Sequence, residues 1–256
     1  MEYQDIYTRI PQLRGYGTQK VGGAAKAHIL TLTGTTYATI TNGLSTCYPN
    51  TGVASGQQLV SHLTSESIVK VLSTSANDTN AAGTGLRVIR IVGYNDAGTK
   101  ISEDVEMNAT TGKDTTIPFR TILWSECIPI SVGLGGKNHG RIDVKQGSNF
   151  LGSMHSGTNC FQTCSMQVPA GYKATVLSTK VTGNYLTVNI IAGVYTRTAT
   201  GPFQEVPGTF GLSSMTERSP LHNEYTAGSI IEGQCYDMSG AGGVCSMIVE
   251  VLMQPI

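Results

Sequence analysis

Short stretches of alternating apolar and polar residues run through the sequence, separated by clusters of Gly, Asn, Asp, Ser and Pro. The pattern is clearest in residues 86–94 and 101–107, with a turn at residues 95–98 between them. Period-two alternation is typical of strands, and turn clusters about every ten residues are typical of sandwiches. Strands are also expected at residues 27–33, 128–132, 141–145, 174–181, 185–196 and 244–253. We therefore expect an all-β fold of antiparallel β-sandwich or jelly-roll-like units with an extended N-terminal arm.

The 256 residues divide into three parts. Residues 1–65 are rich in Gly, Thr, Ser and Gln, and we interpret them as an N-terminal arm with the first strands. Residues 66–150 form a predicted β-sandwich unit, and residues 165–256 form a second, jelly-roll-like sandwich unit. The polar stretch between them is a domain boundary or a long crossover. A single large β domain is the alternative.

Charge argues against several classes of partner. Charged residues make up 13% of the chain, and 17 Lys and Arg balance 17 Asp and Glu. Without an excess of positive charge the chain is not expected to bind nucleic acid. The N-terminal residues lack the basic and apolar regions of a secretory signal, and no stretch is apolar enough to span a bilayer. We expect no membrane partner and folding in a cytoplasm.

Candidate ligand sites in the sequence are incomplete. The glycine-rich residues 133–140 contain a Gly-Lys step, but no Ser or Thr follows the lysine as a phosphate-binding loop requires. Cys160 and Cys164, with His155 and Cys235, could supply soft metal ligands, but a structural zinc site typically uses two close pairs and only one is present. We expect no cofactor or metal, and six reduced, mostly buried thiols.

Catalytic groups are equally sparse. Alternation splits the acidic cluster of Glu103, Asp104 and Glu106 between two faces of a strand, so these carboxylates cannot act as a facing pair. No Gly-x-Ser-x-Gly turn is present, and none of the five histidines has an evident catalytic partner. We therefore assign no catalytic residue and expect that the chain is not an enzyme.

One run is more specific than the rest. Residues 73–88, Ser-Thr-Ser-Ala-Asn-Asp-Thr-Asn-Ala-Ala-Gly-Thr-Gly-Leu-Arg-Val, resemble the run S-A-x-D-T-x-A-G-T-G-A-R-x-V. That run recurs in uncharacterised structural proteins of tailed, often marine, bacteriophages and of some large DNA viruses. Asp78, Gly83, Gly85 and Arg87 match this run, while Leu86 replaces the usual alanine. Val-Pro-Ala-Gly-Tyr at residues 168–172 also resembles the start of the second β unit of those proteins.

The resemblance implies a virion structural protein of a tailed double-stranded DNA virus, assembled in the host cytoplasm. A head-associated protein that decorates or cements the capsid surface is the favoured role, with the major capsid protein or tail proteins as partners and a homo-oligomer as the expected state. The alternative is a tail, baseplate or fibre component that binds a carbohydrate or a host receptor. Such binding needs aromatic platforms, and Trp124 is the only tryptophan.

The arm and the loop of the shared run are the predicted contact elements. The candidate interaction residues are Tyr3, Tyr7, Arg9, Arg14, Tyr16, Asp78 and Arg87. For residues 77–85 the simpler interpretation is a turn whose glycines serve only backbone geometry. A surface rich in Thr, Ser and Asn suits permanent packing, because it offers hydrogen bonds without the desolvation cost of charges.

Overall fold

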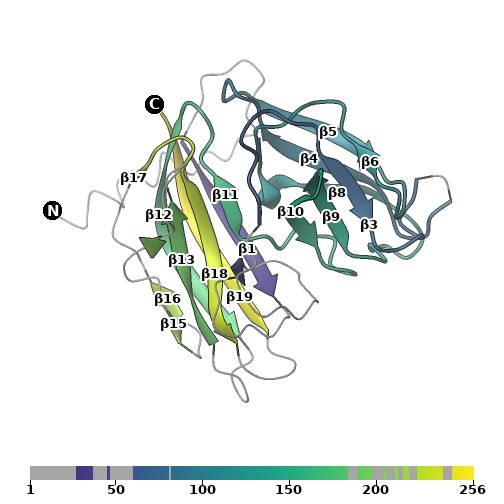
Figure 1. Ribbon diagram of the computed structural model, residues 1–256. Helices are drawn as coiled ribbons and strands as arrows, with labels where there is room; N and C mark the ends of the chain where they lie inside the picture. Colours follow the sequence, from purple (N-terminus) through teal and green to yellow (C-terminus); the bar gives the residue numbers. More distant parts are fainter. Residues whose placement is uncertain are drawn as a thin grey trace.

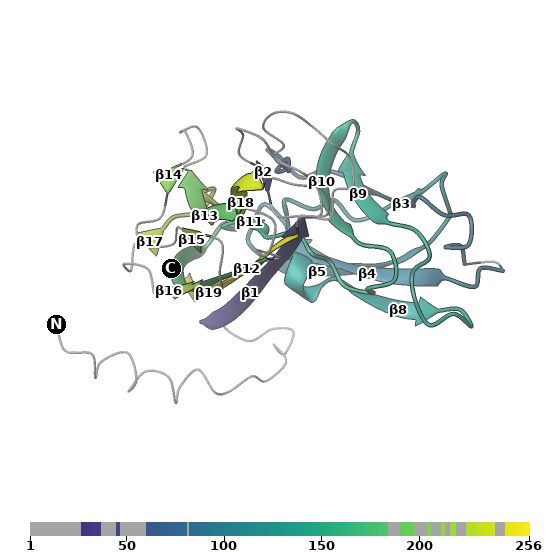
Figure 2. The same ribbon diagram turned by 90° about the horizontal axis from the view of Figure 1, so that it is seen from below.

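The strands lie in two lobes, side by side, in a computed structural model of the chain (Figure 1). The structure describes residues 27–36, 45–46, 60–80, 82–183, 190–197, 204–205, 211–212, 216–218, 224–238 and 244–256. Residues 1–26, the first part of the predicted arm, therefore lie outside the described part. The described residues form strands and one short 3-10 helix, η1 (Trp124–Glu126), which confirms the all-β prediction. Figure 2 shows two layers in each lobe, so each lobe is a β-sandwich.

The first sandwich contains β3 to β10. One sheet has the order β10-β9-β3-β6, with β10 (Asn149–Met154), β9 (Ile142–Gln146), β3 (Lys70–Ser73) and β6 (Lys113–Asp114). The other has the order β5-β4-β7, with β8 also paired to β4, and consists of β5 (Lys100–Glu106), β4 (Leu86–Tyr94), β7 (Thr121–Ile122) and β8 (Ile128–Val132).

The second sandwich combines the start and the end of the described chain. Its first sheet has the order β1-β19-β12-β16, with β1 (His28–Thr36), β19 (Cys245–Pro255), β12 (Tyr172–Gly183), β16 (Thr216–Arg218) and β17 (Glu224–Tyr225), which pairs with β12. Its second sheet has the order β11-β18-β13-β14, with β11 (Ser165–Gln167), β18 (Ile230–Met238), β13 (Ile190–Arg197), β14 (Gln204–Glu205), β15 (Gly211–Leu212), paired with β13, and β2 (Ser45–Thr46), paired with β18.

The placement of β1 and β2 differs from the predicted division, which grouped them with the arm. Leu30 and Leu32 alternate with exposed Thr31 and Thr33, so β1 has one apolar face that must be covered. The two leucines are buried in the core of the second sandwich, and β1 pairs with β19 along its whole length. A strand with one apolar face cannot bury that face alone, which is why β1 joins a distant sheet.

The predicted hairpin is confirmed as β4 and β5, which pair antiparallel from Val88↔Glu106 to Tyr94↔Lys100. Arg90 lies opposite Asp104, and its guanidinium donates two hydrogen bonds of 2.6 and 2.7 Å to that carboxylate. These bonds to Arg90 lower the pKa of Asp104. Both side chains are well exposed, so solvent screens the pair and its contribution to stability is small.

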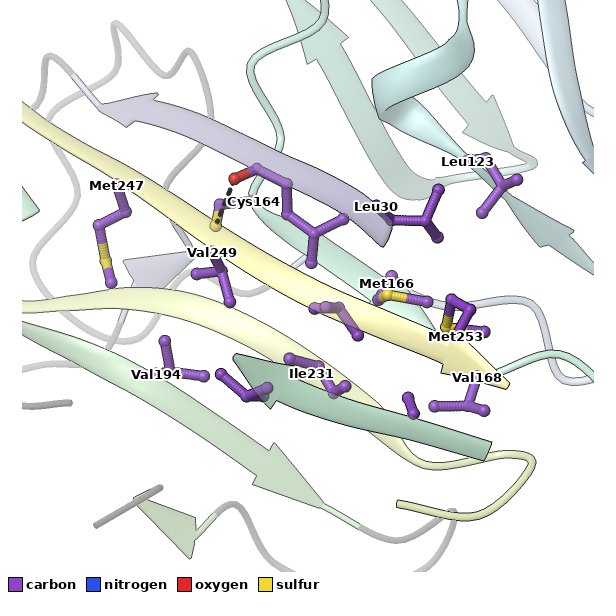
Figure 3. Close-up of a cluster of buried hydrophobic side chains, with 14 of the residues drawn as sticks. Leu30, Leu123, Cys164, Met166, Val168, Val194, Ile231, Met247, Val249 and Met253 are labelled. Atoms are coloured by element: carbon purple, nitrogen blue, oxygen red, sulfur yellow. Dashed lines mark hydrogen bonds between the residues drawn. The ribbon is translucent and has the colours of Figure 1, made fainter. Parts of the chain in front are cut away.

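Each sandwich encloses an apolar core. In the first, the core is formed by Leu63, Val69, Val71, Leu86, Ile89, Ile91, Val92, Val105, Met107, Phe119, Ile122, Trp124, Cys127, Ile142, Val144, Leu151, Met154 and Phe161. In the second, labelled in part in Figure 3, it includes Leu30, Leu32, Cys164, Met166, Val168, Tyr172, Ala174, Val176, Val181, Val194, Ile231, Cys235, Cys245, Met247, Val249, Val251 and Met253.

Two side chains of the first sandwich belong to the core of the second. Tyr94, the last residue of β4, is completely buried, and its ring lies 5.4 Å from that of Tyr172 at the start of β12. Leu123, just before η1, is buried in the same core and lies near Leu30 in Figure 3. Arg120 adds a polar link, because its Nη1 donates to the carbonyl of Leu63 and to Oε1 of Gln167 in β11. The two sandwiches therefore share one seam.

Truncating Tyr94 is expected to destabilise both sandwiches together. Replacing it by alanine leaves a cavity in the shared seam, which we expect to cost about 3–5 kcal/mol of unfolding free energy. The Tyr94→Phe variant keeps the ring that fills the seam and removes only the hydroxyl. The control Tyr94→Phe is therefore expected to cost less than about 1 kcal/mol. Urea denaturation measures both values, and equal losses in the two variants would contradict this account of the seam.

Candidate functional site

Three loops meet at one end of the first sandwich and are joined by side-chain hydrogen bonds. They are residues 74–85 between β3 and β4, residues 133–141 between β8 and β9, and residues 155–160 after β10. Side-chain hydrogen bonds link the first loop to the second and the second to the third. We call this group the loop cluster.

Asp78 is the centre of the loop cluster. Its side chain is completely buried, and its carboxylate accepts four hydrogen bonds, which come from the Ser73 hydroxyl and from the backbone N–H groups of Leu86, His139 and Gly140, at 2.6–2.9 Å. Hydrogen bonds to a carboxylate are stronger than those between neutral groups. The glycine-rich residues 133–140 thus supply two of the four donors to the Asp78 side chain.

The glycines of the shared run make this arrangement sterically accessible. A Cβ on Gly85 would collide with Asp78 Oδ1 and with the His139 ring, and a Cβ on Gly83 would collide with the backbone of Asn77 and Thr79. The close approach of these chain segments therefore requires glycine at both positions.

Two asparagines join the second and third loops. The backbone N–H of Asn138 donates to Asn159 Oδ1, and the N–H of Asn159 donates to Asn138 Oδ1, at 2.9 and 3.0 Å. Asn138 is buried, and its Nδ2 also donates to the carbonyls of Gly140 and His155. The backbone of Asn159 has a φ of 54°, in the left-handed region that asparagine tolerates better than most residues. These bonds fix the shape of loops that contain few apolar contacts.

The outer surface of the loop cluster presents a small set of side chains. Leu134 is 98% exposed between glycines, and Lys137, His139 and Cys160 are also exposed. The carboxylate of the cluster, Asp78, is buried and bonded, so this surface offers no acid for proton transfer. Such a surface can form contacts, but it lacks the paired acid and base of a catalytic site.

None of the predicted interaction residues that the structure describes is free to contact a partner in the way the sequence suggested. Tyr3, Tyr7, Arg9, Arg14 and Tyr16 lie outside the described residues. Asp78 cannot touch a partner because it has no exposed surface, so its predicted contact role is replaced by a structural one. Arg87 is half-buried, and its Nε donates to the carbonyl of Gly83 at 3.0 Å. Arg87 therefore also supports the loop rather than standing free.

The other candidate side chains make contacts within the fold. Glu103 accepts hydrogen bonds from the backbone N–H groups of Thr116 and Ile117, while Asp104 pairs with Arg90. Trp124 is buried against Phe161, with ring centroids 5.1 Å apart, so it provides no exposed platform for a sugar. The described residues contain no group of three or more His, Cys, Asp or Glu side chains placed to hold a metal ion. The described part also contains no helix suited to crossing a membrane.

A buried polar cluster lies between the sandwiches, and no sequence pattern predicted it. The Ser165 hydroxyl donates to Glu232 at 2.8 Å, and Nε2 of His62 lies 3.0 Å from that hydroxyl and 3.5 Å from the carboxylate. The same His62 nitrogen faces both partners, whereas a catalytic triad uses opposite ring nitrogens for the serine and the acid. Glu232 and Ser165 are buried, so we interpret the cluster as part of the seam.

The five described cysteines are free thiols, and all except Cys160 are buried. Burial raises the pKa of Cys127 to about 12 and raises the pKa of Cys164 as well, because a thiolate is poorly solvated in an apolar core. Cys164 lies in the core of the second sandwich, away from the exposed Cys160. Cys47 lies outside the described residues.

No protein-family model matches the sequence, and no curated protein matches it. Solved structures of infectious bursal disease virus are similar to the chain at a low level. For the Gt strain the identity is 12% and the TM-score 0.23, covering 97% of this chain and 78% of that chain. For the Gx strain the identity is 12% and the TM-score 0.18, covering 95% and 80%. Similarity at this level identifies neither a family nor a shared fold.

Replacing Asp78 by asparagine is expected to loosen the loop cluster. One carboxylate oxygen becomes an NH2 group that faces backbone donors, and an unsatisfied buried donor costs about 1–3 kcal/mol. The control Asp114→Asn changes a carboxylate that is 60% exposed and 3.8 Å from Lys70, and it should cost less than about 0.5 kcal/mol. Chemical denaturation measures the difference, and equal stabilities of the two variants would rule out a structural role for Asp78.

Thiol labelling tests the burial of the cysteines. At pH 8 a thiol of pKa about 12 is ionised in about one molecule in ten thousand, so Cys127 should react with iodoacetamide only on unfolding. Cys160 is exposed and should react in the native protein. Peptide mapping by mass spectrometry reads out both sites. Native labelling of Cys127 as fast as Cys160 would show that the first sandwich opens readily.

Proposed function

We propose that the chain is a structural protein of the virion of a tailed double-stranded DNA virus. In the favoured role it binds the outside of the head as a decoration or cement protein, with the major capsid protein and further copies of itself as partners. It performs no catalysis in this role.

The proposal rests on the structural role of residues 73–88, the run that resembles the phage proteins. Four of its matching residues, Asp78, Gly83, Gly85 and Arg87, serve the loop cluster. Asp78 accepts the hydrogen bonds, the two glycines allow the close approach, and Arg87 bonds to the carbonyl of Gly83. A run whose matching residues build a loop, instead of a reactive site, is what a structural protein needs. This supports carrying the virion role over from the resembling proteins.

The character of the surface agrees with this role. With 13% charged residues and zero net charge, copies of the chain repel one another little. The loop cluster holds Leu134 on a base fixed by hydrogen bonds, so ordering the loop on binding costs little entropy. We propose the loop cluster as one contact of the chain with the particle.

The second proposal is a tail, baseplate or fibre component that binds a host receptor or carbohydrate. The rigid loop cluster favours it too, because exposed loops on a sandwich often carry binding sites. None of the exposed large apolar side chains among the described residues is aromatic, so glycan binding is the weaker of the two proposals.

Sedimentation with virus parts tests the proposal. The purified full chain is mixed with emptied capsids, or with isolated tails, of the virus whose genome encodes it. We expect the chain to sediment with capsids and Leu134→Asp to weaken that binding at least about tenfold, since a charge replaces an exposed apolar contact. Ile128→Asp, at an isoleucine 47% exposed on β8, is the matched control and should bind as the wild type does.

Three outcomes would overturn the head-associated role. Sedimentation with tails alone would move the protein to the tail. Binding on a glycan array at millimolar sugar, without binding to either particle part, would favour the receptor-binding alternative. No binding to capsids, tails or sugars would reject both proposals.

A further inference from the structure

A small cavity lies at the seam between the two sandwiches. Its lining comes from both of them, with residues 61–63, residues 120–122, Trp124 and Leu151 on the side of the first and Met166 and Gln167 of β11 on the side of the second. The cavity has a volume of about 20 Å³ and is partly open to solvent. Because a buried water needs about 10–15 Å³, there is room for one water molecule or one ion of similar size, and none for a sugar or a nucleotide.

The polar groups that line the cavity suit an anion. They belong to Ser61, His62, Arg120, Thr121 and Gln167, and none of the lining residues is Asp or Glu. Hydroxyl, amide and guanidinium groups all donate hydrogen bonds, and the guanidinium always carries a positive charge. Hydrogen bonds between such donors and an anion are stronger than those between neutral groups. A positive charge and several donors, without a carboxylate, favour an anion over a cation.

Thr121 is the lining residue whose hydroxyl needs a partner. The residue is 4% exposed, and its Oγ1 has no hydrogen-bond partner among the described residues. A buried hydroxyl without a partner destabilises a fold, because it loses its hydrogen bonds to water and gains none in return. A ligand that accepts a hydrogen bond from Thr121 removes this cost.

Arg120 supplies the positive charge. Its Nη1 donates to the carbonyl of Leu63 and to Oε1 of Gln167, and its Nε lies 3.2 Å from Oδ1 of Asp96. These contacts leave the two N–H groups of Nη2 without a hydrogen-bond partner in the described part of the chain. The Asp96 side chain is 59% exposed, so solvent screens its attraction to the guanidinium. Arg120 can therefore interact with a second anion.

Glu232 is the carboxylate to be considered beside this cavity. It lies 3.5 Å from Nε2 of His62, but only His62 of the two lines the cavity. The hydroxyl of Ser165 and the side-chain amide of Gln234 donate to the Glu232 carboxylate at 2.8 and 2.9 Å. Because these donors stabilise its negative charge, the repulsion that it exerts on an anion in the cavity is reduced.

We propose that the cavity binds one small monovalent anion of about the size of chloride. The anion accepts a hydrogen bond from the hydroxyl of Thr121 and is attracted by the guanidinium of Arg120. Since both sandwiches line the cavity, an anion bound there stabilises the seam between them. A ligand that binds only the folded chain raises the temperature of unfolding. The inference goes beyond the proposed virion role and does not depend on it.

Thermal unfolding of the full chain tests the proposal. The midpoint temperature is measured in sodium chloride and in sodium gluconate, an organic anion too large for the cavity, at the same pH and ionic strength, so that screening is equal. General effects of the two salts on hydration act on all variants alike, so the response is taken relative to the variant Thr121→Val. We expect exchange of gluconate for chloride to raise the wild-type midpoint by at least about 2 °C more than that of Thr121→Val. Equal responses would overturn the proposal.

Two threonine variants separate anion binding from packing. Thr121→Val keeps a β-branched side chain and removes the hydroxyl, so in gluconate it should be at least as stable as wild type. The matched control is Thr115→Val, at a threonine 3% exposed whose Oγ1 accepts a hydrogen bond of 3.1 Å from the N–H of Val69. This control should lose stability in both salts and keep the full response to chloride. A control that lost the response would mean that the response depends on stability in general, and would also overturn the proposal.

Bromide locates the anion. It resembles chloride and scatters X-rays anomalously, so crystals of the wild-type chain soaked in sodium bromide reveal its position. We expect an anomalous peak within hydrogen-bond distance of Thr121 Oγ1 and next to the Arg120 guanidinium, and no such peak in crystals of Thr121→Val. A cavity that contains only water in the soaked wild-type crystals would contradict the proposal.

Discussion

Tyr94 and Leu123 come from the first sandwich but pack into the core of the second. Both are buried among the strands of the second sandwich, although β4 and the residues before η1 are parts of the first. Removing the first sandwich would therefore leave a hole in the second. Around this apolar contact lie the Arg120 link and the buried group of His62, Ser165 and Glu232. Because buried polar groups tolerate little displacement, these partners fix the relative position that Tyr94 and Leu123 establish.

The loop cluster solves a different problem, which is how to hold loops in place without an apolar core. Asp78 gathers donors from three separate places in the chain, and the Asn138 and Asn159 pair repeats the principle one loop further on. In each case a side-chain oxygen replaces the backbone partner that a strand would have provided. A chain poor in charge can thus keep an exposed apolar residue, Leu134, on a well-defined loop.

Local patterns predicted the strands well, and distant contacts poorly. Residues 86–94 were expected as a strand and form β4, because alternation reflects the two environments of its faces. The strand expected at residues 27–33 overlaps β1 (His28–Thr36), but no local signal shows that it pairs with β19. Asp78 fits a turn by sequence, while its bonds to His139 and Gly140 depend on how two loops close in space. The cluster of His62, Ser165 and Glu232 has no sequence signal for the same reason.

The pairing of residue 36 with residue 245 also has a consequence for synthesis on the ribosome. At a synthesis rate of roughly 5–20 residues per second, β19 is completed about ten to forty seconds after β1. The first sandwich, whose strands are contiguous in the chain, can form during that interval, while Leu30 and Leu32 remain uncovered. Truncation before Cys245 would therefore remove the strand that pairs with β1 and leave Leu30 and Leu32 without part of their cover.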